Sequence, residues 1–424
     1  MINDVINQYR TVVMSLASTT RSYAPTVRAT RFGPGGRSAR SSRVVVARAD
    51  ASSASRMRRR DALLVGLLLA TETSSRNGAF ADEENAAAED VVVAPPPAKM
   101  RVVITGSNSG IGLDAAYKLA TTGTRVVALA CRTLDKAERA KREILQRAAD
   151  EGKTIDPNDV ECFECDLASL ASVRKFARDV GGPVDALALN AGVEYSGDPT
   201  VHRTEDGFEE TIGVNHLGHF LLANLLLPKL EVSSAAHPRI VVTSSEVHDP
   251  SSPGGSVGKG ATLGDLSGME RDGKAFEMIS GEEFDADKAY KDSKLCNMLF
   301  AYELERRLEA AGSKITVNSF GPGLITRTGL FRHQPALFVK AFDIATNDIF
   351  KVAETVDGGG NCLVYMLTDE TLDGVGGTYF NNKLSPGTPP TGHAFVQTPS
   401  SAESNRADEA AKLWSLSESL VGLR

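Results

Sequence analysis

The chain has few cysteines and no long apolar run near its start, and each shortage excludes a class of protein. Its 424 residues include five cysteines, an odd number that suits a reduced enzyme better than a disulfide framework. The apolar run at 62–70 covers about nine residues, whereas a membrane-spanning helix needs ~20. Cys162 and Cys165 form a C-x-x-C pair in a strand-like alternation, where residues three apart point to opposite faces. We therefore expect no metal or redox pair there.

Lysine is absent from residues 1–60, which contain twelve arginines and only two acidic residues. This Arg-rich, acid-poor and Ser-rich composition is typical of an organelle transit peptide, with a basic arm for nucleic acid as the alternative. Three arginines at 58–60 then precede the apolar run, and A-F-A follows at 79–81, which is the pattern of an export signal of twin-arginine type. One long transit peptide is the alternative. The sequence predicts a chloroplast protein, located in the stroma or associated with the thylakoid. The thylakoid lumen is the alternative location.

Composition divides the chain into three predicted regions. Residues 1–60 form the transit peptide, 61–99 hold the second signal and a linker, and 100–424 form one folded domain. Residues 1–81 carry a charge of +9, so the remainder carries −16 of the total −7. An acidic domain argues against nucleic acid as a partner.

Short apolar runs alternate with helical patterns from residue 100 onward. We predict strands at 100–105, 125–130, 160–165, 184–189, 239–243 and 315–320. This alternation predicts an α/β fold with a Rossmann-like, doubly wound parallel sheet in a single domain. The candidate polar residues lie at the C-terminal ends of these strands or on the helices that follow, where ligands bind in such sheets.

A glycine-rich loop, G-S-N-S-G-I-G at 106–112, follows the first predicted strand and runs into a helical pattern. Glycines let backbone approach a pyrophosphate, and the helix N-terminus offers N–H groups and a positive dipole to it. A glycine turn without a ligand is the alternative. The residues predicted to bind a dinucleotide here are Thr105, Gly106, Ser109, Gly110, Ile111 and Gly112.

No acidic residue lies between Thr124 and Leu134, after the second predicted strand. An acid near this point binds the ribose 2′-hydroxyl of NAD, whereas an arginine such as Arg132 accommodates the 2′-phosphate of NADP. This pattern favours NADPH as the cofactor, and capping of a helix by Arg132 is the alternative. Asp166, at the end of the third strand, is placed either to accept from an adenine amino group or to cap the next helix.

Tyr290 and Lys294 lie four residues apart in a helical pattern, and therefore on one face of the helix. The ammonium favours the phenolate, so we expect the pKa of Tyr290 to fall towards a range in which it exchanges a proton. An amphipathic surface helix is the alternative. His216 and His219, three apart on an earlier helix, lack a third ligand, so we interpret them as packing or surface residues and predict no metal site.

Together these motifs resemble the short-chain dehydrogenase/reductase family over roughly residues 100–385. The residues that carry the resemblance are T-G-S-N-S-G-I-G at 105–112, Asn190-Ala191-Gly192, Asn215, Ser245, Tyr290-x-x-x-Lys294 and Pro322-Gly323. The resemblance implies that Tyr290 donates a proton and that Lys294 holds the nicotinamide ribose and lowers the Tyr290 pKa. It implies that Ser245 bonds the substrate or Tyr290 and that Asn215 holds a relay water. The further residues implied to bind the cofactor are Asn190, Ala191, Gly192, Pro322 and Gly323.

Finer motifs resemble the light-dependent protochlorophyllide reductases within that family. Ser245 and Tyr290 are 45 residues apart, where most family members need far fewer. The shared stretches are N-H-L-G-H-F-L-L at 215–222, A-T-L-G-D-L-S-G-M at 261–269, A-Y-K-D-S-K-L-C-N-M at 289–298, T-G-L-F-R at 328–332 and L-W-S-L-S-E-S-L-V-G-L at 413–423. The resemblance implies a step of chlorophyll biosynthesis in which light drives hydride transfer from NADPH to a ring double bond of protochlorophyllide.

The chain departs from that group near the site. N-A-G-V-E-Y at 190–195 replaces the usual N-A-A-V-Y, and Leu189 and Leu324 replace cysteines. The alternatives are a plastid carbonyl or retinoid-like reductase, which would use the same residues on a ketone, and a non-catalytic NADPH-binding sensor. The segment 332–350 carries apolar residues that could cover a large apolar substrate or contact a membrane, so the expected partners are such a substrate and a membrane surface.

Overall fold

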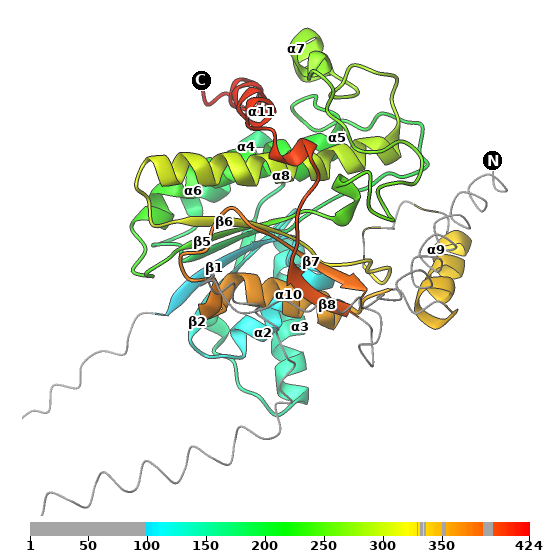
Figure 1. Cartoon of the computed structure of the whole chain (residues 1–424). Helices are drawn as coiled ribbons and strands as arrows, with labels where there is room; N and C mark the ends of the chain where they lie inside the picture. The colour runs from blue at the N-terminus through cyan, green and yellow to red at the C-terminus, as the bar shows by residue number, and fades with distance from the viewer. Residues whose placement is uncertain (1–98, 329, 331–333, 335, 350–352, 385–392) are drawn as a thin grey trace, which may run out of the picture. The chain divides into compact units, whose positions relative to one another are not determined.

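The computed structural model describes residues 99–328, 330, 334, 336–349, 353–384 and 393–424 (Figure 1). The predicted transit peptide and all of the second signal lie outside the described residues, as do parts of the apolar segment 332–350. In the described part of the chain, no helix has both the length and the apolar character needed to cross a membrane.

One eight-stranded sheet forms the centre of the folded part, in the order β3-β2-β1-β4-β5-β6-β7-β8. The strands are β1 Met100–Thr105, β2 Arg125–Cys131, β3 Val160–Glu164, β4 Ala186–Leu189, β5 Arg239–Thr243, β6 Thr316–Gly321, β7 Tyr379–Leu384 and β8 His393–Gln397. Neighbouring strands pair in parallel except β7 and β8, which are antiparallel. The predicted doubly wound parallel sheet is confirmed, with one antiparallel edge strand added, and its order reverses between β1 and β4.

The last two strands were not predicted. The sequence of β7, Y-F-N-N-K-L, interrupts its apolar residues with two asparagines. Asn381 and Asn382 are nevertheless only 3% and 6% exposed. The Asn382 side chain donates to the Pro322 carbonyl at 3.1 Å and to Glu354 Oε2 at 2.9 Å. A strand whose buried side chains are polar lacks the apolar pattern by which strands are recognised.

Helices cover both faces of the sheet (Figure 1). On one face lie α4 Leu170–Asp179, α6 Gly218–Glu231, α8 Ala286–Ala310 and α11 Ala407–Leu420, and on the other lie α2 Gly110–Ala120, α3 Leu134–Asp150 and α10 Val356–Thr368. Three short helices are α5 Glu210–Ile212, α7 Ser267–Asp272 and α9 Ala336–Asp343. Each face has its own apolar cluster, and Cys165 belongs to one while Cys162 packs against the other. The two thiols therefore lie on opposite faces, as predicted.

The long segment between β5 and α8 is anchored on the first turns of α8. Lys288 Nζ lies 2.6 Å from Asp292 Oδ2, with the two side chains 2% and 0% exposed, and it also donates to the Thr262 carbonyl at 2.8 Å. Lys291 Nζ donates to backbone carbonyls at 257 and 259. Because Tyr290 lies between these lysines, the same turns of helix carry both the anchor and the predicted proton donor.

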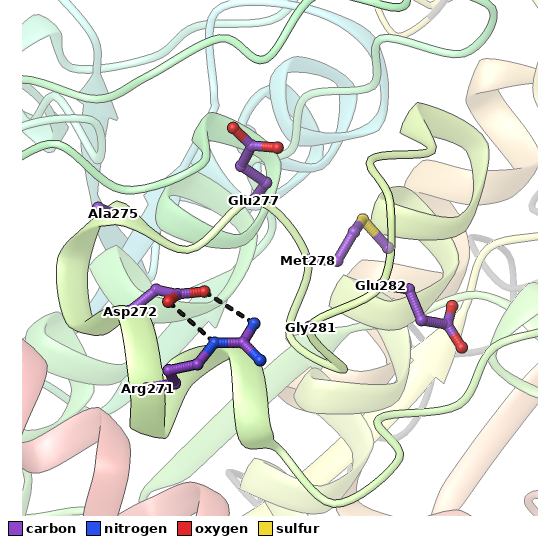
Figure 2. Close-up of a pocket in the computed structure, with 7 residues that line it drawn as sticks. All are labelled: Arg271, Asp272, Ala275, Glu277, Met278, Gly281 and Glu282. Carbon is purple, nitrogen blue, oxygen red and sulfur yellow. Dashed lines mark hydrogen bonds and ion pairs between the residues drawn. The ribbon is translucent and has the colours of Figure 1, made fainter.

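The same segment contains an open pocket of about 540 Å³ (Figure 2). It is lined by Arg271, Asp272, Ala275, Glu277, Met278, Gly281 and Glu282. The Arg271 guanidinium pairs with the Asp272 carboxylate at 3.0 Å, as Figure 2 shows. None of the predicted catalytic or cofactor-binding residues lines this pocket.

Candidate active site

The Thr105 hydroxyl joins the ends of β1 and β4. Its Oγ1 accepts the N–H groups of Asn190 at 2.8 Å and of Ala191 at 3.1 Å, while Asn190 Nδ2 donates to the Thr105 carbonyl at 3.0 Å. Thr105 Oγ1 also lies 2.9 Å from His219 Nε2, and His219 Nδ1 lies 3.0 Å from the Asn215 carbonyl. Since a carbonyl can only accept, Nδ1 carries the hydrogen and Nε2 accepts from the hydroxyl. Burial lowers the pKa of His219 to about 4, which keeps this neutral form.

The two histidines are packing residues rather than surface residues. His216 and His219 are each 1% exposed, and His216 Nε2 lies 2.9 Å from Ser417 Oγ on α11. His219 has the additional task of holding Thr105, and the sequence carried no signal for it beyond its position on the helix. The turn at 190–192, which is predicted to contact the cofactor, therefore depends on a side chain from α6.

The glycine-rich loop fits a dinucleotide. Gly106 has φ +67°, and a Cβ there would lie 2.9 Å from Ala191 Cα; a Cβ at Gly112 would lie 2.6 Å from the Gly106 carbonyl oxygen. Ser109 is the N-cap of α2 but makes no side-chain cap bond, and the first turn contains no acid, so the helix N-terminus stays available to an anion. Asn190 Oδ1 is buried and has no hydrogen-bond partner among the described residues, which leaves an acceptor at the same edge.

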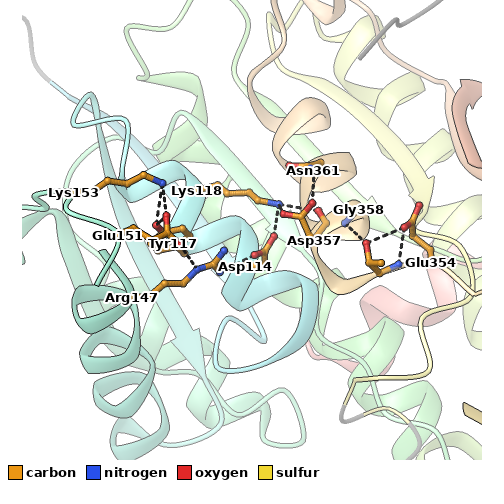
Figure 3. Close-up of polar contacts among 11 residues, drawn as sticks. Asp114, Tyr117, Lys118, Arg147, Glu151, Lys153, Glu354, Asp357, Gly358 and Asn361 are labelled. Carbon is orange, nitrogen blue, oxygen red and sulfur yellow. Dashed lines mark hydrogen bonds and ion pairs between the residues drawn. The ribbon is translucent and has the colours of Figure 1, made fainter. Parts of the chain in front are cut away.

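A polar network holds α2 against α3 and α10 (Figure 3). Asp114, on α2, pairs with Lys118 at 2.5 Å and with Arg147 of α3 at 2.9 Å. Lys118 also lies 2.9 Å from the Asp357 carboxylate on α10. A Cβ at Gly360 would lie 2.1 Å from Asp114 Oδ2, so α10 approaches α2 closely. This network, which the sequence did not reveal, positions the helix whose N-terminus would meet the pyrophosphate.

Arg132 follows β2, with its side chain 43% exposed. Its Nε lies 3.9 Å from Asp166 Oδ1. Helix α3 is capped instead by Thr133, whose hydroxyl accepts the Lys136 N–H at 3.4 Å, so the capping alternative for Arg132 is wrong. Asp166 Oδ1 accepts the Ala168 N–H at 3.0 Å, and its carboxylate therefore closes the turn that leads into α4. The N-cap of α4 is Ser169, so Asp166 does not cap that helix, and its contact with an adenine amino group stays a prediction.

The predicted catalytic pair lies near the start of α8. Tyr290 is half-buried, and Lys294 is 4% exposed with its Nζ 5.3 Å from the centre of the Tyr290 ring. Ser245 follows β5 and starts the short turn at 246–248, which packs against α8. His248, 1% exposed, contacts the Ser245 carbonyl through Nδ1 at 2.6 Å. The fold thus brings the strand end that bears Ser245 against the helix that bears Tyr290.

The predicted fall in the pKa of Tyr290 is wrong for this arrangement. Burial raises the pKa of Tyr290 well above its usual value, and the charge of Glu194 raises it further. The Lys294 ammonium faces the ring of Tyr290, and burial lowers the pKa of that ammonium to about 8. The phenol therefore keeps its proton at neutral pH, which suits a proton donor.

Asn215 links the turn after β4 to α8, the helix that bears Tyr290. It lies in the π-helical turn Gly213–Leu217, and its Oδ1 accepts the Val193 N–H at 2.8 Å. Its Nδ2 donates to the Val193 carbonyl and to Ser293 Oγ, both at 3.0 Å, and Ser293 Oγ donates to the Tyr290 carbonyl at 2.6 Å. Both amide hydrogens are used in holding these segments. A relay water at Asn215 stays a prediction.

Pro322 and Gly323 lie in the loop that follows β6. Gly323 has φ +88°, a conformation that favours glycine. Further along this loop, Thr328 reaches the glycine-rich loop: a Cβ at Gly110 would lie 3.2 Å from Thr328 Cγ2. The ends of β1, β4 and β6 therefore contribute to one region, as expected for ligand binding at the carboxyl edge of a parallel sheet.

The profile of the short chain dehydrogenase family matches residues 100–261. The chloroplastic protochlorophyllide reductase of Cucumis sativus is 40% identical to this chain over 333 residues, which cover 77% of the chain and 78% of that protein. This chain belongs to the short-chain dehydrogenases. The chloroplastic protochlorophyllide reductase of Marchantia paleacea is 36% identical, covering 77% of the chain and 68% of that protein. Among solved structures, an uncharacterized protein from Mycobacterium Paratuberculosis has a TM-score of 0.53 and 31% identity, covering 77% of the chain and 94% of that structure.

Membership of the short-chain dehydrogenases makes this protein an oxidoreductase that uses a nicotinamide dinucleotide and acts on a small molecule. The profile covers the glycine-rich loop, Asn190, Asn215 and Ser245, and it ends before Tyr290. The two curated relatives extend the similarity over most of the folded part of the chain. The resemblance seen in the sequence motifs is therefore confirmed at the level of the family.

Proposed function

We propose that this short-chain dehydrogenase is an NADPH-dependent, light-driven protochlorophyllide reductase of the chloroplast. The observation that carries the proposal is the placement of Tyr290, with Lys294 Nζ 5.3 Å from its ring centre, on a helix that packs against the strand end bearing Ser245, at the same edge of the sheet as the glycine-rich loop. Protochlorophyllide is the pigment named for relatives about 40% identical over most of the folded part. Of the two lost cysteines, Leu189 is 0% exposed in the apolar core, so that replacement changes the core rather than a substrate contact.

Each proposed residue acts on a stated atom. When bound, NADPH supplies the hydride. Tyr290 gives its phenolic proton to the substrate carbon, and the Lys294 ammonium over its ring counters the negative charge left behind. Ser245 orients the phenol or the substrate. The Asn190–Gly192 turn, fixed by Thr105, holds the nicotinamide end of the cofactor.

Illumination tests the proposal directly. Purified protein with NADPH and protochlorophyllide should lose the pigment's absorbance only in the light, and a dark sample serves as the control. Ketone reduction in the dark, with no response of the pigment to light, would favour a carbonyl or retinoid-like reductase. Tight NADPH binding without either activity would make the protein a sensor.

The names of the relatives and the composition of residues 1–60 support the proposed location in the chloroplast. The segment Ala336–Asp343, A-L-F-V-K-A-F-D, is mostly apolar and follows the loop after β6. We include in the proposal that this segment covers the pigment or rests on the thylakoid surface from the stromal side.

Replacing Arg132 by Ala should weaken NADPH binding by about tenfold and leave NADH binding nearly unchanged, because a charge-assisted contact to the 2′-phosphate contributes about 1.5 kcal/mol. Titration of both cofactors by fluorescence measures this. Arg139→Ala is the control, since Arg139 is 71% exposed and pairs with Asp135. Equal weakening of the two cofactors would refute the assignment of Arg132 to the 2′-phosphate.

A further inference from the structure

A buried carboxyl group, Glu194, lies in the segment that follows β4, and the sequence motifs assigned it no role. It is 9% exposed, and Asn215 holds the preceding residue, Val193, by both its N–H and its carbonyl. The Ser196 hydroxyl donates to Glu194 Oε1, and among the described residues no donor is bonded to Oε2. A carboxylate with so few donors is costly to bury unless a cation compensates it.

Lys294 is the cation whose charge favours the ionised form of Glu194. A Cβ at Gly192 would lie 3.7 Å from Lys294 Nζ and 3.4 Å from Asn215 Oδ1, so the segment that bears Glu194 passes directly against the ammonium. Within the described part of the chain, this ammonium has one hydrogen-bond acceptor, the Thr243 carbonyl at 3.5 Å. A buried ammonium with a single distant acceptor depends on nearby negative charge to keep its proton.

The charges around Glu194 come from α8. The pKa of Glu194 is raised to about 7, mainly by burial; the hydrogen bond from Ser196 opposes this rise, the charge of Asp287 adds to it, and the charge of Lys294 opposes it. Burial lowers the pKa of Lys294 to about 8, and Glu194 opposes that fall. Burial and then Glu194 raise the pKa of Tyr290. On the α6 side, His219 stays neutral because burial lowers its pKa to about 4.

We propose that Glu194 is a positioning residue of this active site, whose carboxylate keeps the Lys294 ammonium protonated and adds to the burial that keeps the Tyr290 phenol protonated. The inference rests on the roles proposed above for Tyr290 and Lys294 and adds the group that sets their charge. With Glu194 ionised, Lys294 stays charged and can bind the nicotinamide ribose, and Tyr290 carries the proton that it donates. With Glu194 neutral, Lys294 loses its proton more readily. A substrate whose own anionic group approached this position would be repelled.

Glu194→Gln removes the charge and retains the shape of the side chain. In the wild type, NADPH affinity should fall as the pH rises through about 8, where Lys294 loses its proton. In the variant the midpoint should move to lower pH by on the order of one unit, because the neighbouring negative charge is gone. Fluorescence titration of NADPH from about pH 6 to about pH 9 measures the midpoint. An unchanged midpoint would overturn the proposal.

A spectroscopic readout needs neither pigment nor light. The difference between infrared spectra of the cofactor-free full-length wild type and of Glu194→Gln should contain a protonated-carboxyl band that vanishes as the pH rises through about 7. Burial also raises the pKa of Asp292 to about 7, but the band of Asp292 is common to both proteins and cancels in the difference. A difference spectrum without this band would equally overturn the proposal. If light-driven reduction failed, the infrared result would be unaffected. A failure of the proposed function can therefore be told apart from a failure of the proposal about Glu194.

Two further variants separate the charge of Glu194 from its packing. Glu194→Asp keeps the charge on a shorter side chain and should keep the wild-type midpoint for NADPH, whereas a purely structural role would disturb Asp and Gln variants alike. Glu305→Gln is the matched control. Glu305 is a half-buried carboxyl further along α8 that accepts the Val317 N–H at 2.6 Å, and burial raises its pKa as well. Glu305→Gln should leave the pH midpoint of the fall in NADPH affinity unchanged.

Discussion

Replacing Tyr290 by Phe should lower light-driven turnover by about 10²–10⁴-fold while NADPH binding stays within about twofold of wild type. The substitution removes the phenolic proton and keeps the ring over which Lys294 lies at 5.3 Å. The raised pKa of Tyr290 means that its proton is present throughout the neutral range, so the loss should be similar at every pH in that range. Single-turnover absorbance after a light pulse measures the chemical step, and fluorescence titration measures binding.

Tyr302→Phe is the matched control for this experiment. Tyr302 lies on the same helix, and its hydroxyl donates to Ser400 Oγ at 2.9 Å, away from the predicted site. This variant should turn over at the wild-type rate. Turnover of Tyr290→Phe at that rate would remove Tyr290 from its role as donor, and a large loss of NADPH affinity in Tyr290→Phe would assign it to binding instead.

Replacing Lys288 by Met should lower the free energy of unfolding by about 3 kcal/mol. The ammonium of Lys288 and the carboxylate of Asp292 are buried together at 2.6 Å, and removal of the cation leaves an uncompensated buried carboxyl. Because these turns of α8 also carry Tyr290, turnover should fall with stability. Urea denaturation of the full-length chain, followed by circular dichroism, measures the change.

Two comparisons show whether the burial of the pair is responsible. Lys175→Met breaks the exposed pair of Lys175 with Asp179, whose side chains are 65% and 45% exposed, and should cost less than about 0.5 kcal/mol. The double variant Lys288→Met/Asp292→Leu should recover part of the lost stability, since both buried charges are then gone. A double variant less stable than Lys288→Met alone would contradict this account of the pair.

Much of the sheet could be predicted because its local pattern is strong. The strand predicted at 100–105 matches β1, and that at 239–243 matches β5, since strands buried on both faces are near-continuous apolar runs. The strand predicted at 184–189 begins two residues early, and β7 was missed because its buried asparagines are polar. Strand ends were predictable to a residue or two, whereas polar strands at the edge of the sheet were not.

The electrostatics of the site could not be predicted, because they depend on burial and on contacts between distant segments. Tyr290 and Lys294 are four residues apart, which places them on one face of α8. That spacing does not show that the ammonium faces the ring, or that the charge of Glu194 raises the pKa of Tyr290. The sign of the Tyr290 pKa shift was therefore predicted wrongly. Asp166 was likewise left between two roles, and its bond to the Ala168 N–H, outside α4, is a third contact that the sequence did not reveal.

The sequence by itself determined which residue types stand at the strand ends and which family the chain resembles, because glycine loops, strand runs and helical spacing are local patterns. The tertiary structure decided which of those residues are held together and in what charge state. Thr105 meets Asn190 and His219, Asn215 holds Val193, and Glu194 acts on Lys294 only because parallel strands bring remote segments to one edge of the sheet. Burial at that edge then sets the pKa values, and burial is a property of the packed chain rather than of any stretch within it.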